Sequence, residues 1–337
     1  MRAALIRSMG EPPEVAELPV PEPSRGEALV RVSAASLNPV EAHIWSGRFF
    51  DGSPCTPYVP GIEGVGVVER GERLAPGTRV RVEIVHPGYG RDGTLAEYVT
   101  APEEPDEADR ASQAMAFPLP DGIDDATGAA LGAAGGTALT LLERAREAGA
   151  EIAGAVVLVL GGTGAVGGIA LQLARRLGAS RVIAAGRNRE RLRRATELGA
   201  DATVQLDGNA EVLRERFTQA GGGRLDLVLD PLWGTPARAA MEALTTGGVL
   251  VNFGQAAAVE AELPSLPLRN RRVALVGHSG AWTTAAQRRA TFERLLELAV
   301  AGGVIVDVEE LPLEALPAAW ERLRASAGAK LVVRPRA

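Results

Sequence analysis

The pattern of apolar and polar positions changes character about a third of the way along the chain. In the first third, short apolar runs alternate with turn signals such as Pro76-Gly77. The runs with strand character are 3–6, 28–33, 65–69 and 79–85. Closely spaced strands punctuated by Gly and Pro predict a twisted, barrel-like β unit.

From residue 121 onward, apolar strands alternate with amphipathic helices. Residues 155–160 form a continuous apolar run, as expected for a parallel strand buried on both faces. A helix over 168–177 follows, with Ile169, Leu173 and Leu177 on one face. The alternation continues through strands 181–185, 202–205, 225–229 and 248–253 and helices 189–198, 211–217 and 235–244. This rhythm predicts an α/β fold with a doubly wound parallel sheet of Rossmann type. Beyond residue 265 we expect a strand over 273–276, a helix over 285–300 and a closing strand over 329–334 that returns to the first unit.

A glycine-rich turn joins the first strand of this second unit to its helix. Gly162, Gly164 and Gly167 follow the spacing G-x-G-x-x-G directly after a buried strand. In that setting the first glycine permits the tight turn, the second lets backbone approach a pyrophosphate and the third lets the helix pack against the strand. The start of the helix supplies free N–H groups for the phosphates. We expect a dinucleotide here, bound by Gly162, Thr163, Gly164, Ala165, Val166 and Gly167; the alternative is a turn that binds no ligand.

The end of the next strand indicates which dinucleotide is bound. NAD-binding proteins usually place Asp or Glu there, about 20 residues further on, to bind the ribose 2′-OH. This chain has Gly186 and Arg187 instead, and Arg187 and Arg191 share a helix face. Because a guanidinium binds a 2′-phosphate bidentately, the pattern favours NADPH over NADH. The other interpretation is a solvated arginine-rich face, because Lys330 is the only lysine among 36 basic residues.

Composition excludes several classes of protein. Hydrophobic residues make up 46% and charged residues 23%, as in an ordinary globular protein. The net charge of −6 argues against a nucleic-acid partner, and no apolar stretch approaches the ~20 residues of a membrane span. The first 14 residues lack the apolar core of a signal peptide, so the expected localisation is cytoplasmic. Cys55 is the only cysteine, which excludes an intramolecular disulfide and a zinc site built from several thiolates.

Several further motifs occur in a fixed order: SLNPVE at 36–41, PGIEGVGVV at 60–68, PGTRV at 76–80, GTLAEYV at 93–99 and Ala329-Lys330. Together with the glycine turn, this series resembles the medium-chain dehydrogenase/reductase superfamily, in its zinc-independent quinone oxidoreductase (zeta-crystallin-like) branch. The resemblance covers essentially the whole chain. It implies a Rossmann cofactor domain at 121–265, a GroES-like catalytic domain built from 1–120 and 266–337, and an active site in the cleft between them.

The resemblance also bears on metal chemistry. Zinc-dependent relatives have Cys at the position of Asn38 and His at that of Ile62, so we expect no zinc. Hydride chemistry without a Lewis acid then implies an NADPH-dependent reductase acting on a small molecule, either a quinone or the C=C of an α,β-unsaturated carbonyl. The alternatives are an enoyl-thioester or secondary-metabolite tailoring reductase, and a non-catalytic NADPH-binding protein.

By the same resemblance, the expected catalytic residues are Asn38, whose amide can donate a hydrogen bond, and His43, as an acid or substrate-orienting group. The alternative for His43 is a histidine without a catalytic role, either on the surface or packed against the cofactor. Glu63 is expected to have a structural task beneath the site. Arg48 and Tyr58 are expected in the substrate pocket, and the remaining cofactor contacts are Thr137, Phe253, Gly254, Gln255 and Lys330. Asp230 is expected to face the cofactor crevice. A homodimer is implied, with strand 273–276 as an edge that two subunits could pair.

Overall fold

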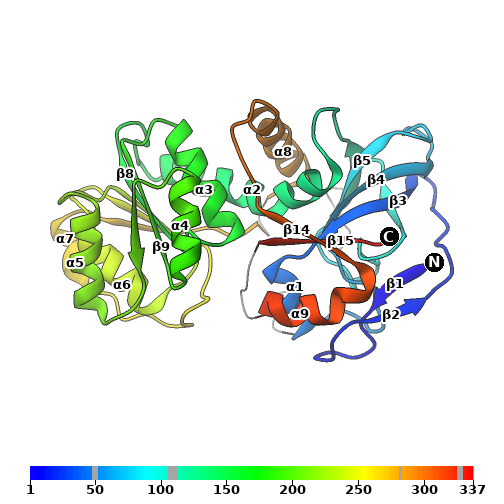
Figure 1. The fold of residues 1–337 in the computed structure, drawn as a ribbon, viewed down its shortest axis with the longest axis horizontal. Coiled ribbons are helices and arrows are strands. Elements are labelled where there is room, and N and C mark those ends of the chain that lie inside the picture. The colour runs from blue at the N-terminus through cyan, green and yellow to red at the C-terminus, as the bar shows by residue number, and fades with distance from the viewer. Residues whose placement is uncertain (48–51, 105–112, 281–282, 325–328, 337) are drawn as a thin grey trace. The chain divides into compact units, whose positions relative to one another are not determined.

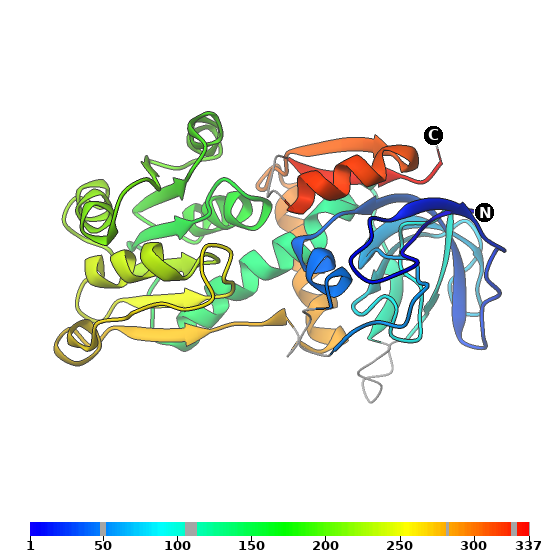
Figure 2. The ribbon, with the colours of Figure 1, turned by 90° about the horizontal axis from the view of Figure 1, so that it is seen from below.

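The computed structural model describes residues 1–47, 52–104, 113–280, 283–324 and 329–336. They fall into two compact units, seen in Figures 1 and 2. Unit 1 comprises Met1–Ala134, Thr284–Val300 and Val306–Ala337, and unit 2 comprises Gly135–Thr283 and Ala301–Ile305.

Unit 1 is built on a mainly antiparallel sheet. Its strands, among the described residues, run in the order β14-β15-β3-β4-β5-β7, with β6 paired to β3. Their bounds are β3 Glu27–Ser36, β4 Glu63–Arg70, β5 Arg79–Ile84, β6 Tyr98–Pro102, β7 Ala114–Pro118, β14 Val308–Pro312 and β15 Lys330–Arg334. A separate pair is formed by β1 (Arg2–Leu5) and β2 (Glu14–Glu17). The first and last parts of the sequence therefore share one sheet.

The helices of unit 1 complete its core. Within the described residues they include α1 (Pro39–Trp45), α8 (Ala285–Val300) and α9 (Leu316–Arg324), with a 3-10 turn at Leu313–Ala315. Trp45 of α1 and Trp320 of α9 are buried and pack edge to face, with ring centroids 6.2 Å apart. Such pairs stabilise a core beyond the apolar area that they bury.

Unit 2 is the doubly wound half. Six parallel strands of the described chain run in the order β10-β9-β8-β11-β12-β13, and helices flank the sheet (Figure 1). The strands are β8 Val156–Leu160, β9 Arg181–Gly186, β10 Ala202–Gln205, β11 Leu227–Asp230, β12 Val249–Asn252 and β13 Ala274–Gly277. The helices are α3 Ala165–Arg176, α4 Arg189–Glu197, α5 Ala210–Ala220, α6 Gly234–Ala243 and α7 Ser265–Asn270. Strands β8, β9 and β11 are almost wholly buried, which explains their continuous apolar sequence.

The predicted fold class is confirmed. The boundaries between the two units differ from the predicted domain boundaries at 120/121 and 265/266. Strand β13 pairs with β12 in parallel, Val249 opposite Ala274, so residues 266–283 belong with the parallel sheet. Helix α2 (Asp125–Glu147), which the apolar pattern did not predict, contains the boundary between Ala134 and Gly135. Its glycines, poor helix formers, obscure the signal.

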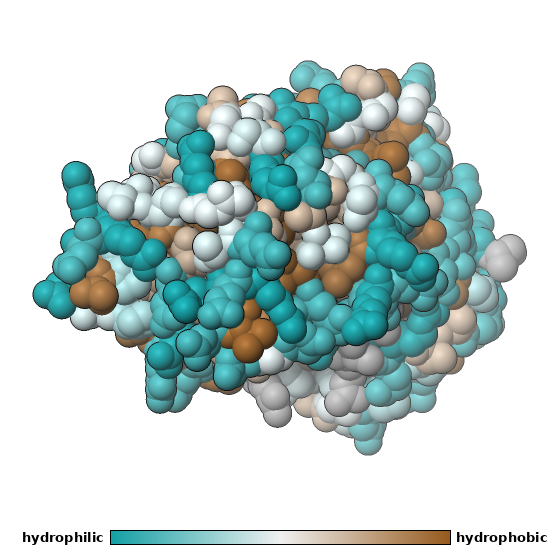
Figure 3. All heavy atoms as spheres, turned by 60° about the vertical axis from the view of Figure 1, so that its left-hand side comes forward, coloured by the Kyte–Doolittle hydropathy of each residue, from teal (hydrophilic) through white to brown (hydrophobic). Residues whose placement is uncertain are grey.

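The surface is largely polar. Figure 3 shows one face, where hydrophilic residues predominate and apolar patches are small and interspersed. Exposed large apolar side chains include Val259, Leu266 and Leu268, which precede β13 in the sequence. Within the described residues, no helix has the length and apolar character needed to cross a bilayer.

Candidate functional site

The glycine-rich turn of unit 2 has the shape of a phosphate cradle. A Cβ on Gly167 would lie 2.3 Å from the Gly161 carbonyl oxygen, so only glycine fits there. Gly164 is the N-cap of α3 and has no side-chain cap, and the nearest atom to a Cβ built on it is 3.5 Å away. The N–H groups of the first helical turn have no intrahelical acceptor. The turn therefore fits a dinucleotide pyrophosphate.

The end of β9 lies against this turn. A Cβ on Gly186 would meet Thr163 at 2.6 Å, which explains why the strand ends on glycine. Asn188 caps α4 by accepting a hydrogen bond from the Arg191 N–H at 3.1 Å. Arg187 is exposed and has no ion-pair partner among the described residues. Its guanidinium is therefore available to an external anion.

The ends of β11 and β12 form a compact polar turn. The Asp230 carboxylate accepts hydrogen bonds from the Leu232 and Trp233 N–H groups at 2.8 and 3.0 Å and from the Asn252 amide at 2.9 Å. Burial raises the pKa of Asp230, while these hydrogen bonds oppose the rise. Because its acceptors are used within the turn, Asp230 shapes the loop that carries Phe253, Gly254 and Gln255. Gln255 is exposed, and Phe253, Gly254 and Thr137 are half-buried.

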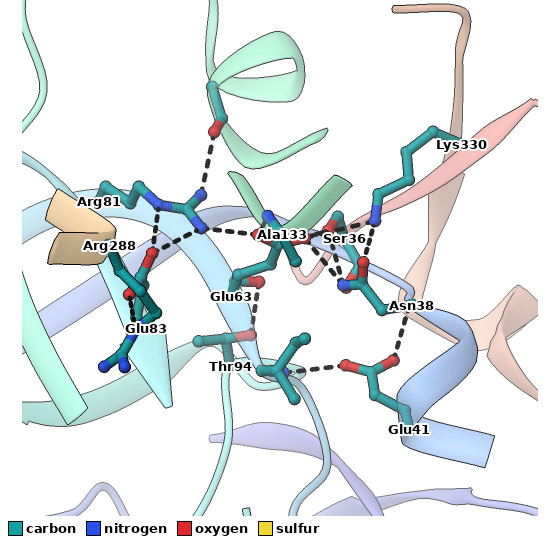
Figure 4. Close-up of polar contacts among 12 residues, drawn as sticks. Ser36, Asn38, Glu41, Glu63, Arg81, Glu83, Thr94, Ala133, Arg288 and Lys330 are labelled. Carbon is teal, nitrogen blue, oxygen red and sulfur yellow. Dashed lines mark hydrogen bonds and ion pairs between the residues drawn. The ribbon is translucent and has the colours of Figure 1, made fainter. Parts of the chain in front are cut away.

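In unit 1, strand register brings the end of β3 to the start of β15. These strands are antiparallel, with Val332 opposite Ser36, and the Leu37 N–H donates to the Leu331 carbonyl at 2.9 Å. The same register places Lys330 beside Asn38, although 292 positions separate them in the sequence. The Lys330 Nζ donates to the Asn38 Oδ1 and lies 3.3 Å from the Glu63 Oε1 (Figure 4).

Glu63 is the centre of this arrangement. The residues around it form the Glu63 cluster: Ser36, Asn38, Glu63, Arg81, Glu83 and Lys330. Oε1 accepts from the Ser36 hydroxyl at 2.5 Å and the Asn38 Nδ2 at 2.8 Å, and also faces Lys330. Oε2 accepts from the Arg81 Nη2 and the Ala133 N–H, both at 2.6 Å. Burial alone would raise the pKa of Glu63, but the Lys330 and Arg81 charges and these hydrogen bonds lower it to about 2.

Arg81 extends the charge alternation away from Asn38. It is 1% exposed, bridges Glu63 and Glu83, and lies 4.4 Å from the centre of the Phe292 ring. Glu83 in turn pairs with Arg288 of α8 at 3.1 Å. A buried charge is tolerated only when it is paired and hydrogen-bonded, and each member here satisfies its neighbour.

Gly132 of α2 makes room for the pair. A Cβ at this position would lie 1.8 Å from the Arg81 Nη2 and 2.2 Å from the Glu63 Oε2. The helix therefore passes directly over the Glu63–Arg81 ion pair, and its Ala133 N–H donates to Glu63. Arg81, Ser36 and Gly132 were not predicted as members of the site. The alternation of Arg and Glu along β5 was the available signal.

Glu41 is a second buried carboxylate, at the start of α1. It accepts hydrogen bonds from the Asn38 N–H at 3.1 Å and the Ile62 N–H at 2.9 Å. Burial raises its pKa to about 7, against the opposing effect of the two N–H groups and Lys330. Its main role is to fix the backbone around Asn38.

The other predicted site residues of unit 1 are not members of the Glu63 cluster. His43 is exposed on α1, where its Nδ1 lies 3.1 Å from the Pro39 carbonyl oxygen, and no described contact joins it to Lys330 or Asn38. A five-residue spacing on a helix turns roughly 140° away, which explains the separation. Tyr58 is 3% exposed within the apolar core, and burial raises its pKa. Arg48 lies outside the described residues.

The donor set around Asn38 does not suit a zinc ion. The Lys330 ammonium contacts the Asn38 Oδ1, so a positive charge already lies where a cation would need to bind. Among the residues that the structure describes, no group of three or more His, Cys, Asp or Glu could hold a metal ion.

Comparisons with known proteins agree with both units. The alcohol dehydrogenase GroES-like domain model matches residues 24–105, and the zinc-binding dehydrogenase model matches 165–302. A zinc-type alcohol dehydrogenase-like protein of Schizosaccharomyces pombe is 30% identical over 66% of this chain and 67% of its own length. The quinone oxidoreductase of Rattus norvegicus is 27% identical over 97% and 95%.

Solved structures give the same answer over the full length. The quinone oxidoreductase from Thermus thermophilus, solved also in complex with NADPH, is 30% identical, with a TM-score of 0.78 over 99% of this chain and 100% of that one. A mycobacterial quinone oxidoreductase is 25% identical, with a TM-score of 0.81 over 99% and 100%. This chain is therefore an oxidoreductase of the medium-chain dehydrogenase/reductase superfamily, and within it belongs to the quinone oxidoreductase branch.

Proposed function

We propose that this protein is an NADPH-dependent, zinc-independent reductase that acts on a quinone or on the C=C of an α,β-unsaturated carbonyl. The observation that carries the proposal is the contact between Asn38 and Lys330. There, a lysine ammonium and an amide lie at a point where zinc-dependent relatives have a metal ligand. A site that offers N–H donors suits an acceptor that gains negative charge on oxygen during reduction.

The cofactor residues follow from unit 2. The residues of the turn, Thr163 to Gly167, would bind the pyrophosphate through backbone N–H groups. Arg187, which precedes the N-cap of α4, and Arg191, in the first turn of that helix, would bind the 2′-phosphate, which NADH lacks. Thr137, Phe253, Gly254 and Gln255 are proposed to contact the remainder of the dinucleotide. When bound, NADPH supplies the hydride. The Thermus thermophilus relative, solved with NADPH, supports this choice of cofactor.

Within unit 1, we assign the role of hydrogen-bond donor to the substrate oxygen to the end of the Glu63 cluster formed by Asn38 and Lys330. His43 remains a candidate for orienting the substrate. Because its Nδ1 faces a carbonyl oxygen, that nitrogen carries the proton in the neutral ring and Nε2 is an acceptor.

A steady-state assay tests the function directly. NADPH oxidation is followed with a benzoquinone, a naphthoquinone, simple enones and enoyl thioesters, on enzyme treated with a metal chelator and on the same enzyme with added zinc. We expect turnover of a quinone or an enone that the chelator leaves unchanged. Oxidation of no acceptor would refute the proposed activity, and dependence on added zinc would refute its metal-free character. Preference for an enoyl thioester would favour that narrower substrate class.

We also propose a homodimer formed through β13, which is one of the two edge strands of the described parallel sheet. An edge strand leaves backbone N–H and C=O groups unpaired, and a second copy of the strand would satisfy them.

A further inference from the structure

Lys330 is chemically singular in this chain. Every other basic residue is arginine, yet lysine occurs at a position that is 6% exposed. Arginine presents a planar fork of five donors and stays charged, whereas lysine presents a compact ammonium with three donors and changes its pKa readily when buried. A general preference for arginine accounts for the surface, but it does not account for a lysine here. The buried position therefore favours a compact ammonium.

Two of the three N–H bonds of that ammonium are directed by the protein. One is donated to the Asn38 Oδ1 and another is directed at the Glu63 Oε1, 3.3 Å away. No third acceptor for Lys330 occurs among the described residues. Two fixed anchors therefore orient one N–H that remains for a ligand, on a side chain that has little freedom because it is 4% exposed.

The Asn38 amide, in contrast, is fully occupied. Its Nδ2 donates to Glu63 at 2.8 Å and lies 3.3 Å from the Ser36 Oγ, and its Oδ1 accepts from Lys330. Freeing a donor for a ligand would leave the buried Glu63 carboxylate with one hydrogen bond fewer, which is costly. A ligand oxygen at this cluster consequently meets Lys330 and not Asn38.

We propose that Lys330 is a catalytic residue that donates a hydrogen bond to the carbonyl oxygen of the substrate, with Asn38 and Glu63 as its positioning residues. The inference rests on the proposed function, and it assigns Lys330 to the substrate instead of the cofactor. Hydride forms a new C–H bond at the carbon β to the carbonyl. The C=C electron pair moves to the Cα–carbonyl bond, and the C=O π pair moves onto oxygen to give an enolate.

Lys330 strengthens its hydrogen bond to that oxygen as the charge develops, and keeps its proton. Water then protonates the α carbon, the enolate pair forms the new C–H bond, and the carbonyl is restored. The substrate thus gains one hydride and one proton, and NADPH is oxidised to NADP+. Preorganised donors of this kind act on the transition state more than on the ground state, so their loss reduces kcat.

A single lysine allows a direct test that needs no turnover. Protein grown on lysine labelled with 13C at Cε gives one lysine side-chain NMR signal. Spectra are recorded alone, with NADP+, and with NADP+ plus cyclohexanone, which carries the carbonyl but no C=C to reduce. Cyclohexane is the matched ligand without an acceptor oxygen. We expect the signal to move on addition of cyclohexanone and not of cyclohexane. A signal that responds to NADP+ but not to cyclohexanone, or to neither, would overturn the proposal.

Kinetics provide the second test, with Lys330→Met and Lys330→Arg. We expect the methionine variant to lose 100- to 1000-fold in kcat for an enone, as for removal of one oxyanion donor. Its Kd for NADPH, measured by cofactor fluorescence, should change less than threefold, and the arginine variant should recover part of kcat. Arg334→Met, which removes a cation from the same strand, is the control and should keep kcat within twofold. Loss of NADPH binding in step with kcat would contradict the assignment.

The two proposals fail separately. A wild-type enzyme that oxidises NADPH with no quinone or enone refutes the proposed function, whereas the NMR response of Lys330 to a ketone is read without catalysis. If Lys330→Met does not fold, the arginine variant and the wild-type NMR experiment still decide the outcome.

Discussion

Replacing Gly132 with alanine tests how closely α2 packs on the Glu63–Arg81 ion pair. The added methyl would lie 1.8 Å from the Arg81 Nη2, so the guanidinium has to move away from Glu63. Both side chains are 1% exposed, and separating a buried pair costs about 3–5 kcal/mol. Alanine recovers about 1 kcal/mol of helix propensity. The expected net loss in the free energy of unfolding is therefore about 2–4 kcal/mol.

Gly136→Ala is the matched control, one helical turn further along α2. No atom lies within 4 Å of a Cβ at Gly136, so only the propensity gain applies and the variant should be about 1 kcal/mol more stable than the wild type. Urea unfolding followed by circular dichroism measures both variants. The two glycines should thus give changes of opposite sign. Equal stabilities for the two variants would show that the ion pair does not occupy the space beneath Gly132.

Three further variants test other parts of the structure. Arg187→Ala should weaken NADPH binding about tenfold to a hundredfold and leave NADH binding unchanged. Arg193→Ala, which removes another exposed arginine, controls for the loss of one positive charge. Equal losses for both cofactors in a fluorescence titration would refute the 2′-phosphate assignment. Burial raises the pKa of Glu41 to about 7, so its contribution to stability is complete below pH 4.5 and is lost as the pH rises through 7. Over this interval the unfolding free energy of the wild type should fall by about 3 kcal/mol relative to that of Glu41→Gln. Parallel curves of unfolding free energy against pH for the two proteins would exclude the effect. Gly277→Pro removes an N–H that points to the open edge of β13, because the hydrogen bonds to β12 on either side use the N–H groups of Ala274 and His278. In gel filtration the wild type should elute as a dimer and this variant as a monomer. An unchanged elution volume would place the interface elsewhere.

Local signals were enough to predict unit 2. The buried strand, the glycine spacing and the absence of an acid after Gly186 lie within about thirty residues, and each has a meaning that does not depend on the rest of the chain. The structure adds the reason for Gly167, whose Cβ would collide with the Gly161 carbonyl. It also shows that Arg187 is exposed and has no ion-pair partner among the described residues, which agrees with a phosphate site and with a solvated arginine surface alike.

The Glu63 cluster could be predicted only in part, because its members meet through sheet register. A structural task for Glu63 was expected, and the contacts show what it is: one carboxylate accepts hydrogen bonds from three strands and a helix. The resemblance implied that Lys330 lies at the cofactor, and the sequence predicted that strand 329–334 returns to the first unit, but no local signal indicated that β15 lies antiparallel to β3 beside Asn38. The contact that gives Lys330 its proposed role arises from that register.

The charges of the cluster constrain how it can change. From Lys330 through Glu63, Arg81 and Glu83 to Arg288, positive and negative groups alternate, each within 3.3 Å of the next. Removing one member leaves its neighbour buried and unpaired, so loss of stability would mask any catalytic effect of that residue. Lys330 stands at one end of the series, next to Asn38, and has one N–H directed at no acceptor among the described residues. Catalysis and stability are therefore separable at Lys330, by the split between kcat and cofactor affinity, but not at Glu63 or Arg81.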